Sequence, residues 1–131
     1  MYFSRAVIIA ALTTLISGGP TLPQDGAACE VSNDSPYVSH VEMTIAKLRE
    51  QGGACANKNF WFSYCTTLAA YETGAIGICG RRDNAATQLS CKEVADYATD
   101  VKNYCAADGK VGGYWKINRH KRIIIFNSER M

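Results

Sequence analysis

Apolar residues recur with helical spacing in two segments of the chain. The stripe of the first segment falls at steps of three, four and three: Val38, Val41, Ile45 and Leu48. We expect this helix to begin at Ser35, with Pro36 at its first position, and to end at Gly52-Gly53, because proline suits a helix start and glycine a helix end. The stripe should face the core, and the charged residues of the other side should face solvent.

The second helical segment has a clearer start signal. Ser90 is followed three residues later by Glu93, which is the reciprocal pattern of a capping box. The apolar stripe behind this cap includes two cysteines: Cys91, Val94, Ala98, Val101 and Cys105. We therefore predict a helix from Ser90 to about Asp108-Gly109, whose buried face carries a cysteine near each end.

Other segments predict β-strands, because β-branched and aromatic residues alternate in them or run together. These segments are 60–64, 68–80, 111–117 and 123–126. Within the second, Ile76 and Ile78 should face one way and small residues such as Gly77 the other, where a helix could approach closely. The last two should form a hairpin around residues 118–122, with its second strand in a central position of the sheet.

The order of these elements predicts an α+β fold. It reads αββαββ, or βαββαβ if a short strand precedes the first helix, and indicates an antiparallel sheet of about four strands covered by two helices, a split βαβ-like sandwich. The chain has 131 residues, which suits one domain, placed here at residues 35–127. Residues 20–34 are polar and without periodicity, which predicts a flexible N-terminal segment tied down only by Cys29. Residues 127–131 should fray.

Residues 1–19 have the layout of a cleavable signal peptide. Arg5 precedes an apolar run at residues 6–16, and small residues with a proline follow at 17–20. The run is shorter than the roughly 20 residues that a bilayer-spanning helix needs. We therefore expect a secreted, extracellular protein. The tripeptide that begins at Asn33 fits this expectation as an N-glycosylation site.

The six cysteines of the chain predict three disulfides, because an even number in a short exported chain is typical of a disulfide framework. They are Cys29, Cys55, Cys65, Cys79, Cys91 and Cys105. Cys91 and Cys105 lie about 21 Å apart on the predicted helix, whereas a disulfide spans a Cα separation of at most about 7 Å. They cannot bond to each other, so the second helix should be joined twice to the rest of the domain. We expect Cys79 to be one of its partners.

The motifs of common enzymes are missing from the sequence. It contains no nucleophile elbow, phosphate loop or metal-binding helix, and its cysteines are too widely spaced for a zinc site, so we expect no metal and no cofactor. The enzyme alternative is a small secreted ribonuclease, in which His120 with Arg119 and Arg122 would supply acid–base chemistry. His40, in the first helix, has no nucleophile or carboxylate at an informative spacing.

The distribution of charge indicates a binding surface in only one segment of the chain. The net charge of the chain is +2, which points to no particular partner, and we expect no nucleic acid. The densest charge is the run at residues 119–122, which at a hairpin tip would project a positive potential toward an anionic surface. The candidate binding residues are this run, a neighbouring lysine and the two tryptophans: Lys116, Arg119, His120, Lys121, Arg122, Trp61 and Trp115.

Four features occur together: the helix at 38–48, the strand at 74–80, the capped helix at 90–105 with a cysteine at each end, and the closing strands from Gly112. Over about residues 35–127 they resemble the small secreted effectors of fungi in the killer-toxin-like and necrosis-inducing-factor group. The resemblance implies two helices on an antiparallel sheet, no cofactor, and a cell-surface protein or membrane component of a host or competitor cell as the partner. In some members a basic residue in a C-terminal loop matters, for which Lys116 and residues 119–122 are comparable. We therefore expect a secreted effector or toxin-like binding protein rather than an enzyme.

Overall fold

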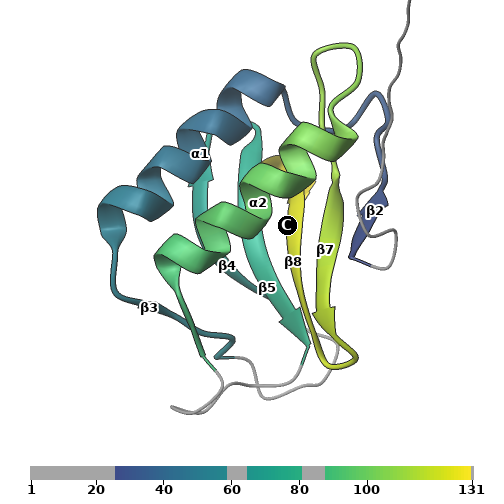
Figure 1. Cartoon of the computed structure of the whole chain (residues 1–131). Helices are drawn as coiled ribbons and strands as arrows, with labels where there is room; N and C mark the ends of the chain where they lie inside the picture. Colours follow the sequence, from purple (N-terminus) through teal and green to yellow (C-terminus); the bar gives the residue numbers. More distant parts are fainter. Residues whose placement is uncertain (1–25, 59–64, 81–87, 131) are drawn as a thin grey trace, which may run out of the picture.

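Two helices lie side by side on one face of an antiparallel sheet in the computed structural model, which describes residues 26–58, 65–80 and 88–130 (Figure 1). The helices are α1 (Val38–Gln51) and α2 (Cys91–Cys105). The five strands stand in the order β2-β7-β8-β5-β4. Their bounds are β2 (Ala27–Cys29), β4 (Cys65–Tyr71), β5 (Gly74–Gly80), β7 (Gly113–Asn118) and β8 (Lys121–Asn127). A second, two-stranded sheet pairs β3 (Ala54–Cys55) with β6 (Leu89–Ser90). The predicted α+β class is confirmed.

The edge strand β2 comes from the segment that was predicted to be flexible. It pairs with β7, with Ala28 opposite Tyr114. Just before it, Gly26 accepts a hydrogen bond from the backbone N–H of Lys116 and lies against the ring of Trp115, where a Cβ would be only 2.6 Å from a ring carbon. Backbone pairing and this close approach form the strand, and neither produces a side-chain pattern that the sequence could show.

The predicted strand at 68–80 is two strands. β4 and β5 form a hairpin whose turn includes Glu72, at a φ of 51°, and Thr73. The strand predicted at 60–64 lies outside the described residues. At the end of β8 the chain does not fray as predicted, because the side-chain amide of Asn127 donates to the Asp34 carbonyl at 2.8 Å and the Ser128 N–H donates to the Thr73 carbonyl at 2.9 Å.

The first helix begins at Val38, two residues after Pro36, its predicted first position. The chain before it pairs instead with residues 109–111, since the Val38 N–H donates to the Gly109 carbonyl at 2.9 Å and the Val111 N–H donates to the Pro36 carbonyl at 3.0 Å. These tertiary hydrogen bonds hold Pro36 in an extended segment outside the helix. The helix ends at Gly52 as predicted, and its predicted apolar stripe is buried or half-buried.

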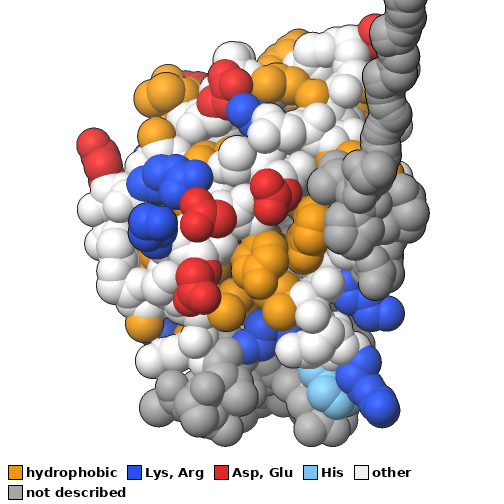
Figure 2. Space-filling model, viewed as in Figure 1, with side chains coloured by type: hydrophobic (Ala, Val, Ile, Leu, Met, Phe, Trp, Pro, Cys, Tyr) orange, Lys and Arg blue, Asp and Glu red, His pale blue; other side chains and the backbone are white. Residues whose placement is uncertain are grey.

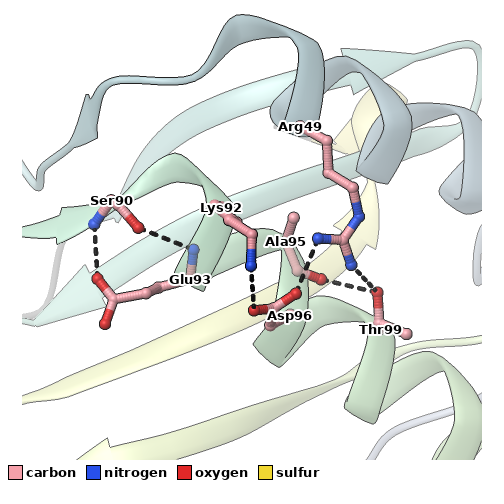
Figure 3. A network of polar contacts seen from close by, with 7 residues as sticks. All are labelled: Arg49, Ser90, Lys92, Glu93, Ala95, Asp96 and Thr99. Carbon is pink, nitrogen blue, oxygen red and sulfur yellow. Dashed lines mark hydrogen bonds and ion pairs between the residues drawn. The ribbon is translucent and has the colours of Figure 1, made fainter.

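The second helix begins with the predicted capping box (Figure 3). The Ser90 hydroxyl accepts the Glu93 N–H at 3.0 Å, and the Glu93 carboxylate accepts the Ser90 N–H at 2.9 Å. The helix ends at Cys105, three residues before the predicted end. The chain turns there, with Asp108 and Gly109 both at positive φ and residues 107 and 110 bonded to each other.

Large aliphatic side chains fill the layer between the sheet and the helices. Ile76 lies opposite Ile125 and Ile78 opposite Ile123, and all four belong to the buried core together with residues of both helices. The prediction that a helix approaches the small-residue face of β5 is therefore wrong. The helices pack on the isoleucine face, while Gly77 on the other face is close to Phe126, whose ring would lie 3.3 Å from a Cβ there.

Three disulfides join all six cysteines: Cys29–Cys105, Cys55–Cys91 and Cys65–Cys79. Both ends of α2 are thus joined to the rest of the domain, as predicted. The expectation that Cys79 would bond to α2 is wrong. Cys79 lies on the face of β5 that points away from the helices and is directly opposite Cys65 of β4, so the neighbouring strand supplies its partner.

The two helices are also joined at the surface by a group of charged side chains (Figure 3). Arg49 of α1 donates to the Asp96 carboxylate at 2.8 Å and to the Thr99 hydroxyl at 3.2 Å, and Lys92 lies 3.8 Å from the same carboxylate. The pKa of the Asp96 carboxyl is below its ordinary value, mainly because Arg49 donates a hydrogen bond to it. The charge of Lys92 also lowers this pKa.

Replacing Asp96 with asparagine tests this connection. Because the pKa of Asp96 is lower in the folded than in the unfolded chain, its charge stabilises the fold above the unfolded-state pKa, and this contribution is lost as the pH falls through the folded-state pKa. We expect Asp96→Asn to lower the free energy of unfolding by less than about 1 kcal/mol near neutral pH, since exposed ion pairs contribute little. Urea unfolding at a series of pH values measures it. A difference from the wild type that stayed constant into acid would contradict the assignment.

Candidate functional site

The face of the sheet that points away from the helices, called the outer face here, is covered by no helix or strand within the described ranges. Side chains alternate along a strand, so residues directly opposite each other on neighbouring strands share a face. One row across the middle of the outer face follows from the strand pairing: Ala28, Tyr114, Ile124, Gly77 and Thr67. A neighbouring row toward the β7–β8 turn consists of Lys116, Arg122, Cys79 and Cys65.

Two cations lie directly opposite each other in the second of these rows. Lys116 of β7 pairs with Arg122 of β8, and both are exposed. Like charges at directly opposed positions destabilise a strand pair. Within the described part of the chain, neither side chain forms an ion pair with a carboxylate. No carboxylate of the described residues therefore neutralises the positive charge of this pair.

An aromatic ring positions one of the two cations. The guanidinium carbon of Arg122 lies 5.2 Å from the centre of the Tyr114 ring, which is within the range of a cation–π contact. A guanidinium presents several N–H donors in one plane and binds carboxylate, phosphate or sulfate oxygens with two parallel hydrogen bonds. Arg122 is thus held by the sheet in an arrangement that can accept an oxyanion.

The turn between β7 and β8 adds two further side chains to this end of the sheet. Arg119 and His120 are both exposed, and the backbone N–H of His120 donates to the side-chain oxygen of Asn118 at 2.8 Å. A histidine and basic side chains gather at the end of the molecule where this turn lies (Figure 2). We call Lys116, Arg119, His120 and Arg122 the basic end.

Lys121 does not belong to the basic end, and the prediction of its exposure with the rest of the run is wrong. The turn has two residues rather than five, so Lys121 is already the first residue of β8. It shares the face of Ile123 and Ile125 and is only 8% exposed.

Trp115 and the predicted glycosylation site at Asn33 lie away from the basic end. Trp115 is half-buried on the helix side of β7, with its ring 6.1 Å from that of Tyr97, so it does not contribute to the outer face. Trp61 lies outside the described residues. Asn33 is exposed in the loop before α1, where a glycan could be attached.

The two histidines lie at opposite ends of β5. His40 Nδ1 is 2.8 Å from the hydroxyl of Thr73, which precedes the strand, and accepts the Thr73 N–H at 3.3 Å. His120 lies against Gly80, the last residue of the strand. The seven residues of β5 span roughly 20 Å, so the two rings cannot act together on one bond. Among the described residues, no three His, Cys, Asp or Glu side chains are grouped as metal ligands.

A pocket at the other end of the outer face was not predicted from the sequence. It has a volume of about 180 Å³, and its walls come from the loop before α1, the start of β7 and the end of β8. Glu30 and Asp34 are among the residues of its wall, together with the apolar residues Ile124 and Phe126. No local pattern could have shown this pocket, because these residues are about 90 positions apart in the chain.

Comparison with the models of known protein families, with curated proteins and with solved structures finds no match. No helix among the described residues is long and apolar enough to cross a membrane. The three disulfides are typical of proteins that fold in an oxidising compartment.

Proposed function

We propose that this chain is a secreted binding protein, of the effector or toxin-like kind, that acts by contacting an oxyanion on the surface of a host or competitor cell. One observation carries the proposal: the exposed side chains of Lys116 and Arg122 are directly opposed on the outer face, and no carboxylate of the described residues pairs with either. An oxyanion bound by both side chains would convert a repulsive pair into an attractive site. The three disulfides fit a protein that works outside the cell.

The arrangement of the site favours binding to a surface over binding to a buried small molecule. The basic end is exposed and consists of a two-residue turn and the adjoining strand ends. Phosphate groups of anionic lipids and sulfate groups of polysaccharides share the chemistry that such a site recognises. Exposed charges act over roughly 10 Å at 0.1 M salt, so Arg119 would strengthen the contact without touching the same oxyanion.

We expect the triple variant Lys116→Gln, Arg119→Gln, Arg122→Gln to bind anionic surfaces at least about tenfold more weakly than the wild type, because each cation is worth about 1 kcal/mol near such a surface. The free energy of unfolding should change little, since exposed substitutions usually lie within about 0.5 kcal/mol each. Two parallel assays distinguish the anion source. One measures binding to vesicles of phosphatidylserine and phosphatidylcholine, and the other measures binding to an immobilised sulfated polysaccharide. Raised salt should weaken the wild type in the assay that detects binding.

The matched control is Lys47→Gln, Lys92→Gln, Lys102→Gln, which removes the same charge from the helix side. It should bind like the wild type. A basic-end variant that folds and binds as tightly as the wild type at every salt concentration would contradict the proposal. Cleavage of RNA by the wild type, with a bell-shaped pH profile and loss of activity in His120→Ala, would replace it with the ribonuclease alternative.

A further inference from the structure

We infer that two copies of this chain associate through their outer faces in a two-fold symmetric dimer, with the basic end of each copy against the pocket that contains Glu30 in the other. The inference goes beyond the proposed function and does not require it. It rests on three features of one face: an apolar centre, opposite charges at its two ends, and a pocket at the acidic end.

The centre of the outer face is apolar. Tyr114 and Ile124 lie opposite each other on β7 and β8, and Phe126 follows two residues later on the same face. All three are only half-buried, although they stand on β7 and β8, which are two of the three inner strands of the sheet. The small residues Ala75 and Gly77 of β5 lie beside them but are buried, so the accessible part of the patch lies over β7 and β8. Half-buried aromatic and aliphatic side chains in one patch favour contact with a partner.

The two ends of this face carry opposite charges. Lys116 and Arg122 occupy one end, and Glu30, which is exposed, contributes to the pocket at the other end. Among the described residues the Glu30 carboxylate forms no ion pair. Phe126 and Ile124 line the same pocket. The pocket therefore offers apolar surface for the methylene groups of an arginine or lysine, and the exposed Glu30 at its wall offers an opposite charge.

Two-fold symmetry places these ends against each other. Arg122 and Phe126 are four residues apart on β8, about 13 Å, and Ile124 lies midway between them. A two-fold axis that lies between the two sheets, perpendicular to the strands and close to Ile124, brings Arg122 of each copy over the pocket beside Phe126 of the other, so the same contact forms twice. An axis parallel to the strands would instead bring the two basic ends together. Charge thus selects the first arrangement.

The size of the face sets the strength of the association. On the outer side of β5, Ala75 and Cys79 are almost fully buried, so the accessible part of the face lies mainly over β7, β8 and the edge strand β2. Three strands about 4.8 Å apart and about 20 Å long give roughly 300 Å² on each copy. The total of about 600 Å² is below the size of most stable interfaces, so we expect a weak dimer with a Kd on the order of tens of micromolar. A copy within the dimer could not present Lys116 and Arg122 to an anionic target, so dissociation would have to precede binding.

Sedimentation velocity of the purified oxidised protein over a range of concentrations tests the inference, with no lipid or polysaccharide present. The wild type should shift from monomer to dimer between about 1 and 100 μM. Arg122→Glu and Glu30→Arg should each raise the dimer Kd at least about tenfold, because each places like charges at both contacts. The double variant Glu30→Arg, Arg122→Glu exchanges the two charges and should restore the dimer.

The control Lys47→Glu makes the same charge change as Arg122→Glu but on the helix side, and should leave the Kd unchanged. A wild type that remains monomeric at 100 μM, or a dimer that both single variants leave intact, would overturn the inference. Failure of the double variant to recover would also overturn it, since the opposed ends would then not meet. Because no target is present, these results are independent of those with vesicles and polysaccharide, and either proposal can fail alone.

Discussion

Replacing Cys29 and Cys105 together with alanine is expected to lower the free energy of unfolding by about 4.5 kcal/mol, from the loss of loop-closure entropy in the unfolded chain. This disulfide closes the longest loop of the three, with a sequence separation of 76 residues. It also joins the edge strand β2 to the last residue of α2. Since a domain of this size has a total stability of about 5–15 kcal/mol, the loss should amount to about a third of that stability or more.

The matched control for this variant is the replacement of Cys65 and Cys79 with alanine. That disulfide has a sequence separation of only 14 and joins two strands that are already paired. The expected loss is about 3 kcal/mol, so the two variants should differ by about 1.5 kcal/mol. Urea unfolding of both, followed by circular dichroism, measures the difference. An equal or larger loss from the shorter loop would show that native contacts around the sulfurs, and not chain entropy, decide the contribution of each disulfide.

Replacing Gly80 with alanine is expected to destabilise the protein by more than about 3 kcal/mol. The residue has a φ of 118°, and a Cβ there would lie 1.8 Å from the carbonyl oxygen of His120 and 2.7 Å from its carbon. Both atoms belong to the backbone, so no side-chain rotation can remove the clash. β5 and β8 would have to separate at the hairpin end, which would break hydrogen bonds between two inner strands of the sheet. This cost is added to the roughly 1–2 kcal/mol of placing a side chain at positive φ.

Gly109→Ala separates the two contributions. Gly109 also has a positive φ, of 79°, but no atom lies within 4 Å of a Cβ placed there. We expect this variant to lose only the conformational contribution of about 1–2 kcal/mol. Thermal and urea unfolding of the two glycine variants should therefore differ clearly. Equal losses would show that β5 and β8 can move apart at this end without a cost.

Arg122 takes part in both proposed interactions of the outer face, and an experiment can distinguish them. Binding to an anionic target requires Arg122 to be free, whereas the dimer places it against Glu30 of the second copy. An anionic ligand that binds only the monomer must shift the association toward monomer. The two proposals therefore predict that ligand binding and self-association oppose each other, if both are correct.

Features that depend on neighbours in the chain could be predicted from the sequence. The stripe of α1 and the capping box of α2 arise from contacts between residues three or four positions apart, which leave a visible period or a fixed spacing. The exclusion of a bond between Cys91 and Cys105 followed from helix geometry alone. The central position of β8 was predicted from its unbroken apolar run, and β8 is the middle strand of the five.

Features that depend on pairing between distant segments were decided only by the tertiary structure. β2 forms because β7 offers it a partner, and Cys79 bonds to Cys65 because the β4–β5 register places them opposite each other. The composition of the candidate site was also decided by the tertiary structure. The basic run was visible in the sequence, but the length of the turn decides which of its residues belong to β8 and which face each side chain occupies. With a turn of two residues, Lys121 is buried and Arg122 lies opposite Lys116. A strand has a period of two, so one residue more or less in a turn exchanges its two faces, and composition alone does not determine that number.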